Sequence, residues 1–286
     1  MLQLRMSRPN SSPQSAPPIA VRIGFACHRA IILTSTLLMT VLLATDSHAV
    51  ETVTFKSEMN DFVNGMPLPT RTVIGEILIE AQDGGLMLQS DDGRIWTIQP
   101  EQITHRKTDD RALQPLSTDE IAKRLQQELP DGFRVYRTAH YVILHNTSDA
   151  YVRQVGQLFE QLYKGFYAFW KNRRWRLSRP EYPLVALVLA DKKDFLRYAS
   201  AEVGGGAAGE VLGYYHLASN RMTTFFMPHL ERNVATIVHE ATHQLAYNCG
   251  VQQRFADNPV WVSEGMAMYF ESPNFHAASG LSLIHI

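Results

Sequence analysis

Hydrophobic and polar positions change their spacing along the chain, and the change divides it into segments of different predicted structure. From residue 50 to 104, apolar and polar residues alternate in short runs such as Glu51–Phe55 and Thr72–Ile79, which is typical of β-strands. Asp-Gly turns at residues 83–85 and 91–93 separate the runs. The pattern predicts a small all-β meander or barrel domain over residues 50–104, with Trp96 in its core and no catalytic grouping. We expect a packing or targeting role for it.

Helical spacing appears later in the chain. Residues 105–132 are predicted to be a linker followed by a helix, which Ser117 and Glu120 begin with a capping box. From residue 133 to 286 we expect a second domain with a hairpin, a long helix after Ser148 and a strand buried on both faces at Leu184–Ala190. The Gly-rich run at residues 204–209 lacks a phosphate-loop lysine and is expected to be a flexible loop.

The most informative segment is the apolar helical pattern from Val234 to Tyr247, which contains H-E-x-x-H as His239, Glu240 and His243. Side chains four residues apart on a helix lie on the same face, so the two imidazoles can hold one metal ion. Glu240 lies one position further round, where its carboxylate can act on a water at that ion. The alternative is a buried helix that carries two histidines by chance. This spacing favours the metal site.

A second apolar helix is predicted between Asn258 and Glu271, and it carries one acidic residue in its middle, Glu264. A charged side chain on such a helix is rarely buried unless it is paired or bound to a metal. Catalytic zinc commonly takes three protein ligands and leaves one position for water, and two His with one Glu is a known set. The sequence therefore predicts His239, His243 and Glu264 as ligands of one zinc ion.

The two helices, with Trp-Val-Ser-Glu-Gly-Met-Ala-Met-Tyr-Phe-Glu in the second, resemble the gluzincin metallopeptidases of the peptidase-MA-like superfamily, and most closely the bacterial domain of unknown function 1570. The resemblance implies an α+β fold with a zincin-like catalytic domain, a mixed sheet beside the H-E-x-x-H helix. It also implies that His239, His243 and Glu264 bind zinc and that Glu240 is the general base. The family pattern continues beyond residue 286, so we expect the catalytic domain to be C-terminally truncated.

The resemblance further implies that the strand before the metal helix forms the sheet edge along the cleft. Its backbone would then pair with an extended peptide substrate. The residues concerned are Met222, Thr223, Thr224, Phe225 and Phe226. His216 and His229 are close in sequence but are not expected to be ligands, and Cys249 is expected to be a buried thiol.

These observations predict zinc-dependent hydrolysis of peptide bonds, in which Glu240 activates water. A first alternative is an exported binding protein on a catalytically impaired zincin scaffold. A second alternative is a structural envelope protein that binds no metal. Substrate preference and oligomeric state do not follow from the sequence.

Residues 1–49 are predicted to be a signal peptide cleaved after Ala49, because arginines precede an apolar run from Ile31 to Ala44 and small residues follow it. The run is shorter than the ~20 residues of a membrane-spanning helix, so we expect a periplasmic or extracellular protein without stable membrane insertion. The net charge of -1 suggests no nucleic-acid partner. A peptide or protein substrate is the expected partner.

Overall fold

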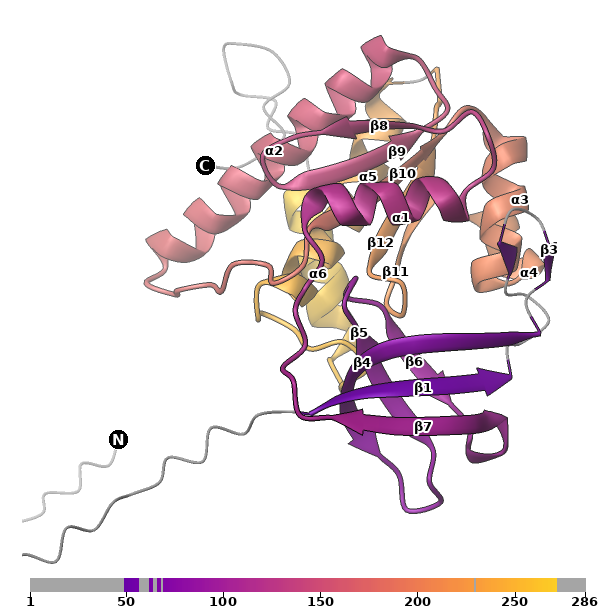
Figure 1. The fold of residues 1–286 in the computed structure, drawn as a ribbon. Helices are drawn as coiled ribbons and strands as arrows, with labels where there is room; N and C mark the ends of the chain where they lie inside the picture. The colour runs from indigo at the N-terminus through magenta and orange to yellow at the C-terminus, as the bar shows by residue number, and fades with distance from the viewer. Residues whose placement is uncertain (1–48, 57–61, 64–65, 68, 229, 272–286) are drawn as a thin grey trace, which may run out of the picture. The chain divides into compact units, whose positions relative to one another are not determined.

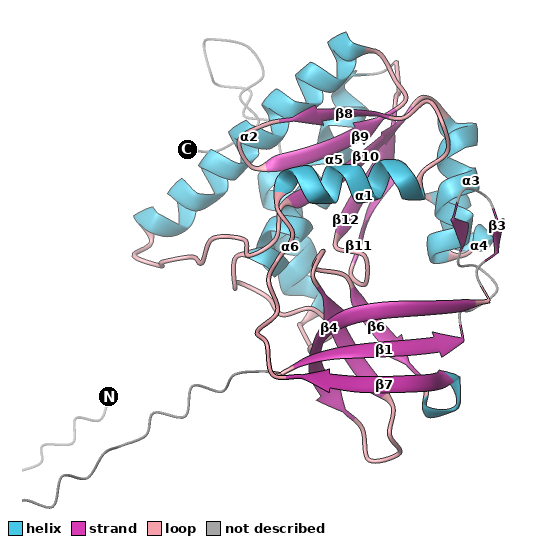
Figure 2. Cartoon of the chain, in the orientation of Figure 1, coloured by secondary structure: helices cyan, strands magenta, loops and turns pink. Residues whose placement is uncertain are grey.

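The structure is a computed structural model (Figure 1). It describes residues 49–271 apart from 57–61, 64–65, 68 and 229. The predicted signal peptide falls outside the described residues except for Ala49, and so does the segment after Glu271, where truncation is expected. Two five-stranded sheets and six α-helices make up most of the described part, which confirms the α+β class (Figure 2). Within it, none of the helices combines the length and the hydropathy that crossing a membrane requires.

The N-terminal sheet is antiparallel throughout, in the strand order β6-β5-β4-β1-β7. Its strands are β1 (Val50–Lys56), β4 (Thr70–Glu80), β5 (Leu86–Ser90), β6 (Ile95–Ile98) and β7 (Ile103–Asp109), with the short pair β2 (Phe62–Val63) and β3 (Met66–Pro67) forming a separate hairpin. Gly84 and Gly93 have φ angles of 91° and 79° in the two predicted turns, a backbone region that glycine adopts without strain. Strands β6 and β7 are the edges, so the described strands form an open sheet rather than a barrel.

The linker predicted from residue 105 is wrong in its first part, because β7 continues to Asp109 and pairs with β1. The strand is polar and largely exposed, so its sequence lacks the alternation of apolar and polar residues that predicts a strand. Pairing with β1 supplies the backbone hydrogen bonds that define it. The following helix, α1 (Thr118–Glu128), begins with the predicted capping box between Ser117 and Glu120.

The second sheet is mixed, in the order β11-β12-β10-β9-β8. Strands β9 (Tyr141–His145), β10 (Leu184–Leu189) and β12 (Arg221–Phe225) run parallel, while β8 (Arg134–Arg137) and β11 (Gly213–His216) are antiparallel edges. The intervening helices are α2 (Asp149–Asn172), α3 (Lys192–Val203) and α4 (Gly205–Glu210). The flexible loop expected at residues 204–209 is therefore wrong, because most of it folds into α4.

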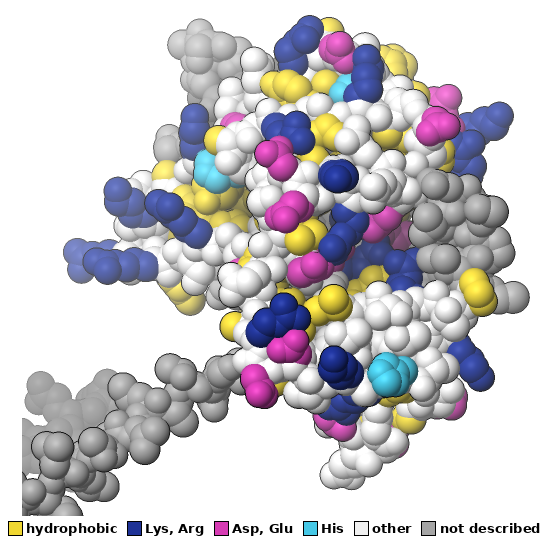
Figure 3. All heavy atoms as spheres, in the orientation of Figure 1, with side chains coloured by type: hydrophobic (Ala, Val, Ile, Leu, Met, Phe, Trp, Pro, Cys, Tyr) yellow, Lys and Arg dark blue, Asp and Glu magenta, His cyan; other side chains and the backbone are white. Residues whose placement is uncertain are grey.

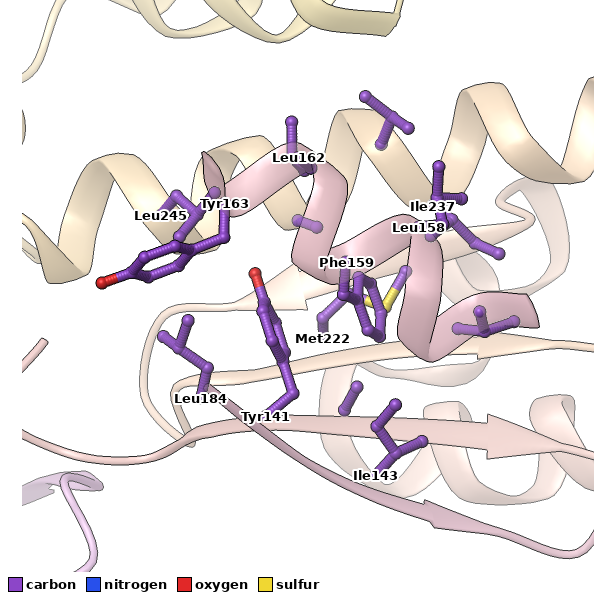
Figure 4. Close-up of a cluster of buried hydrophobic side chains, with 14 of the residues drawn as sticks. Tyr141, Ile143, Leu158, Phe159, Leu162, Tyr163, Leu184, Met222, Ile237 and Leu245 are labelled. Carbon is purple, nitrogen blue, oxygen red and sulfur yellow. The ribbon is translucent and has the colours of Figure 1, made fainter. Parts of the chain in front are cut away.

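Helices cover both faces of the mixed sheet. Helix α2 and helix α5 (Leu230–Asn248) pack on one face, where Tyr141, Ile143 and Met222 contact residues of both helices (Figure 4). Helices α1 and α3 pack on the other face over Val185, Leu187 and Phe225. The predicted central strand, β10, is buried at all six positions. Burial on both faces explains its continuous apolar run.

The expected substrate-binding edge at Met222, Thr223, Thr224, Phe225 and Phe226 is wrong in position. Strand β12 lies between β10 and β11 and is buried along its whole length, whereas Phe226 follows it outside the strand. The edge on this side of the sheet is β11, because the hairpin turn at residues 217–220 folds β11 to the outside. The sequence of this hairpin does not indicate which of its two strands pairs with β10.

Candidate metal centre

The first half of the candidate site lies on α5. The buried apolar stripe of this helix determines how its polar side chains are oriented. Ile237, Val238, Ala241 and Leu245 are almost completely buried against α2 and the mixed sheet. His239, Glu240 and His243 are only partly buried. These three side chains therefore lie at the margin of the buried face of the helix.

The second half lies on helix α6 (Val260–Glu271), which packs on α5 through a narrow face. Ser263, Ala267 and Phe270 are its buried residues. The helix is apolar, as predicted, but much of it is exposed. Trp261 is 79% exposed and the Glu264 side chain is 49% exposed. An α-helix turns once every 3.6 residues, so only every third or fourth side chain of α6 can contact α5. Apolar character alone therefore does not show which side chains of α6 are buried.

The two helices bring His239, His243 and Glu264 together. His239 Nε2 lies 3.2 Å from His243 Nε2 and 3.2 Å from Glu264 Oε2. His243 Nε2 lies 3.5 Å from Glu264 Oε1. The two Nε2 atoms and the Glu264 carboxylate, which faces His239 with Oε2 and His243 with Oε1, thus form a triangle of three groups that could hold a metal ion.

The other nitrogen of each imidazole has its own partner. His239 Nδ1 lies 2.7 Å from Glu271 Oε2, and a carboxylate can only accept, so the proton is on Nδ1. His243 Nδ1 lies 3.2 Å from Ser263 Oγ, whose hydroxyl donates to Gln252 Oε1 at 3.3 Å. The hydroxyl therefore accepts from His243 Nδ1. Both Nε2 atoms are left with lone pairs that face each other and Glu264.

Three electron-pair donors that converge in this way repel one another unless a cation lies between them. Ligands about 2.0–2.1 Å from a tetrahedral zinc ion lie about 3.3–3.4 Å apart, which matches the triangle. Burial lowers the pKa of His243, and the charge of His239 lowers it further. The imidazole is thus favoured in its neutral form, which is the form that binds metals.

Glu240 lies beside this triangle without belonging to it. Its Oε2 accepts a hydrogen bond of 2.8 Å from the backbone N–H of Tyr215 on β11. Burial raises the pKa of Glu240 to about 7, and the charges of Glu264 and Glu271 act in the same direction, against His239 and the Tyr215 N–H. A carboxyl group with a pKa near neutrality can both accept and return a proton.

The remaining candidates lie elsewhere. His216 contacts Ser219 and Glu202, not the triangle, and His229 lies outside the described residues. Cys249 is 1% exposed, and burial raises the pKa of its thiol to about 11. It is therefore a buried thiol, as expected.

Sequence reasoning assigned no role to Glu271, Ser263, Gln252 or Tyr215. Glu271 could have been found, because it follows Glu264 by seven residues, two turns along the same helix. Tyr215 could not, since its backbone and not its side chain contacts Glu240.

Residues 233–285 match the family model described as a protein of unknown function (DUF1570). This match confirms the predicted resemblance to that family over α5, α6 and the segment that follows, and it contains His239, Glu240, His243 and Glu264. A search of curated proteins finds no match to the chain. The family description assigns no activity.

Proposed function

We propose that the chain is an exported zinc-dependent peptidase of the gluzincin type, with a zincin-like catalytic domain formed by the mixed sheet, α5 and α6. The observation that carries the proposal is the triangle of two imidazole lone pairs and a carboxylate, 3.2–3.5 Å on each side. Its atoms are the His and Glu donors that catalytic zinc uses.

His239, His243 and Glu264 would hold the ion, and Glu271 and Ser263 would orient the two imidazoles through Nδ1. Such hydrogen bonds fix the tautomer and the ring direction of a ligand histidine. When bound, zinc supplies a Lewis acid that acidifies water and polarises a carbonyl oxygen.

Glu240 performs the proton transfers. It takes the proton of the attacking water and passes it to the leaving nitrogen of the cleaved amide. The Tyr215 N–H holds one of its carboxylate oxygens, which leaves the other for the water. The protein thereby orients the base before substrate arrives.

A peptide substrate is supported by the position of β11. It is the terminal strand of the mixed sheet, and its Tyr215 N–H points away from β12 towards Glu240. An extended peptide that adds to a sheet edge gains affinity from backbone hydrogen bonds, with little dependence on its sequence. The proposed substrate edge is therefore Gly213–His216.

The proposal is tested on the full chain by elemental analysis and by hydrolysis of casein with and without 1,10-phenanthroline. We expect about one zinc per chain and hydrolysis that the chelator abolishes. The His239→Ala, His243→Ala double variant should lose the metal. Glu240→Gln should keep it and lose hydrolysis by about 10²–10⁴-fold, the usual contribution of general acid–base catalysis.

His105→Ala is the matched control, because it removes an exposed imidazole in β7 far along the chain from the motif. It should change neither zinc content nor rate. Equal zinc in the wild type and the double histidine variant would refute the ligands, and an unchanged rate in Glu240→Gln would refute the base. Zinc without hydrolysis of any peptide would favour the alternative of a binding protein on an impaired scaffold.

A further inference from the structure

A cavity of about 670 Å³ lies between the N-terminal sheet and the α1/α3 side of the mixed sheet. Its walls come from β1, β4, β6, α1, α3, the turn after β11 and the loop between α5 and α6. None of the four residues of the metal centre lines it. Volumes of about 300–1,000 Å³ are typical of sites for small organic ligands, so the cavity can hold one.

The acidic groups in the cavity wall already have partners within the protein. Glu128 accepts from Arg221 at 2.9 Å, and Asp194 pairs with Arg197 at 3.0 Å. Glu202 lies 3.1 Å from His216. These carboxylates need no further cation from a ligand.

Arg94 is the exception in the cavity wall. Its side chain is only 16% exposed, and its Nε is buried without a hydrogen-bond partner among the described residues. The nearest carboxylate oxygen, on Glu128, is 3.8 Å from Nη2, which is too far for a hydrogen bond. A guanidinium has five N–H donors, and leaving buried donors unpaired is costly. The geometry therefore favours an acceptor from outside the protein.

The surroundings of Arg94 are aromatic. Its guanidinium carbon lies 4.9 Å from the ring centroid of Trp96, and Arg71 lies at the same distance from that ring. Phe55, Phe133 and Phe255 complete the apolar part of the wall. Figure 3 shows Lys and Arg side chains set back in a hollow above the N-terminal sheet, with hydrophobic side chains beside them. Trp96, predicted as a core residue, thus also forms part of a cavity wall.

We propose that this cavity binds an organic monocarboxylate with an apolar body, whose carboxylate pairs with Arg94 while the body contacts Trp96 and the phenylalanines. Arginine and carboxylate form two parallel hydrogen bonds of matching geometry. The wall carries four arginines and three acidic residues, Glu128, Asp194 and Glu202, so it matches a single negative charge better than the several charges of a polyphosphate. The carboxylate belongs either to a free organic acid or to the C-terminus of a peptide.

The test is isothermal titration calorimetry on the full chain, with 1,10-phenanthroline present so that neither the proposed metal nor peptide cleavage contributes. The probes are decanoate, decanol, and the peptide acetyl-Ala-Ala-Ala-Phe as free acid and as amide. We expect at least one carboxylate probe to bind at least tenfold more tightly than its uncharged counterpart. Decanoate alone would indicate a free organic acid, and the peptide acid alone would indicate a peptide terminus.

Arg94→Gln should weaken that binding at least tenfold. Arg153→Gln, which removes an exposed arginine on α2, should leave it unchanged. Phe255→Asn is a second variant that should fold, because Phe255 is 44% exposed with φ of 62° and asparagine tolerates this backbone conformation. It should weaken decanoate binding several-fold.

Equal binding of charged and uncharged probes would overturn the proposal, as would wild-type affinity in Arg94→Gln or the absence of binding by every probe. The Glu240→Gln variant should bind the carboxylate as the wild type does. The cavity can therefore be refuted while the metal centre stands, and the reverse is equally possible.

Discussion

The metal centre and the Arg94 cavity are built in opposite ways. Two neighbouring helices, α5 and α6, supply the three candidate ligands, Glu240 and the Nδ1 partners of both imidazoles, between His239 and Glu271. The cavity takes its walls from residues between Phe55 and Phe255. In the metal centre, Nδ1 of each imidazole has a hydrogen-bond partner, whereas in the cavity wall the Nε of Arg94 is buried without one among the described residues. A site whose residues are close together in the sequence can be recognised from a motif, whereas a site assembled from distant segments cannot.

The metal centre requires that α6 be held in place, and this should not depend on the cavity. The substitution with the largest expected effect, Phe270→Ala, tests this. Phe270 is 1% exposed and its ring lies 5.0 Å from that of Phe166. Losing a buried aromatic side chain costs about 3–5 kcal/mol of unfolding free energy, and we expect zinc affinity to fall as α6 loosens. Urea denaturation and zinc titration measure both effects.

Val260→Ala is the control on the same helix, since Val260 is 73% exposed. It should change the free energy of unfolding by less than about 0.5 kcal/mol. Equal effects of the two substitutions would show that α6 is not held through Phe270.

The cavity wall should dominate the acid stability of the molecule. Burial alone would raise the pKa of Glu202, but the hydrogen bond and charge of His216, with the charge of Arg221, lower it to about 2. The unfolded carboxyl titrates near ~4.3, so its stabilisation is present above that pH and is lost as the pH falls towards 2. Glu202→Gln should lose on the order of 2–3 kcal/mol at pH 7 and show a shallower acid transition.

Denaturation of both proteins by urea between pH 7 and pH 2 measures this difference. Glu210→Gln, at an exposed position in α4, should follow the wild type. An acid transition of unchanged slope in Glu202→Gln would contradict the assignment.

Glu271→Gln sharpens the comparison at the metal centre. The neutral amide no longer accepts a charge-assisted hydrogen bond from His239 Nδ1, and such partners are worth about 10–100-fold in metal affinity. Zinc competition with a fluorescent chelator measures the loss, while carboxylate binding in the cavity should not change. Unaltered zinc affinity would show that Glu271 does not support His239.

The smallest effect is expected from Gly93→Ala, which should change the cavity and leave the metal centre unchanged. A Cβ on Gly93 would lie 2.7 Å from Tyr182 Cγ, at a φ of 79°, so Gly93→Ala must move the β5–β6 turn against the segment before β10. We expect a cost of about 2 kcal/mol and weaker carboxylate binding with zinc affinity retained. Thermal unfolding and calorimetry measure these quantities.

Gly132→Ala is the matched control, because Gly132 also has positive φ but has no atom within 4 Å of its would-be Cβ. It should cost about 1 kcal/mol from backbone strain alone. Equal losses in the two variants would mean that contact with Tyr182 is unimportant.

The sequence by itself determined the local features of this protein. Capping residues and apolar periodicity predicted α1, α2 and the buried strand β10, because each depends on neighbours within a few residues. The spacing of His239 and His243 on one helix face has the same origin, and Glu264 was found because it is the acidic residue in the middle of an apolar helix.

Only the tertiary structure decided which strand is the sheet edge, how far the N-terminal sheet extends and which face of α6 is covered. Strand β11 rather than β12 is the edge because β12 pairs with β10, a partner more than thirty residues earlier in the chain. The contacts of Glu240 with Tyr215 and of Arg71 with Trp96 depend equally on packing. Such pairings are set by long-range burial and hydrogen bonding, which leave no periodic signal in the segments that make them.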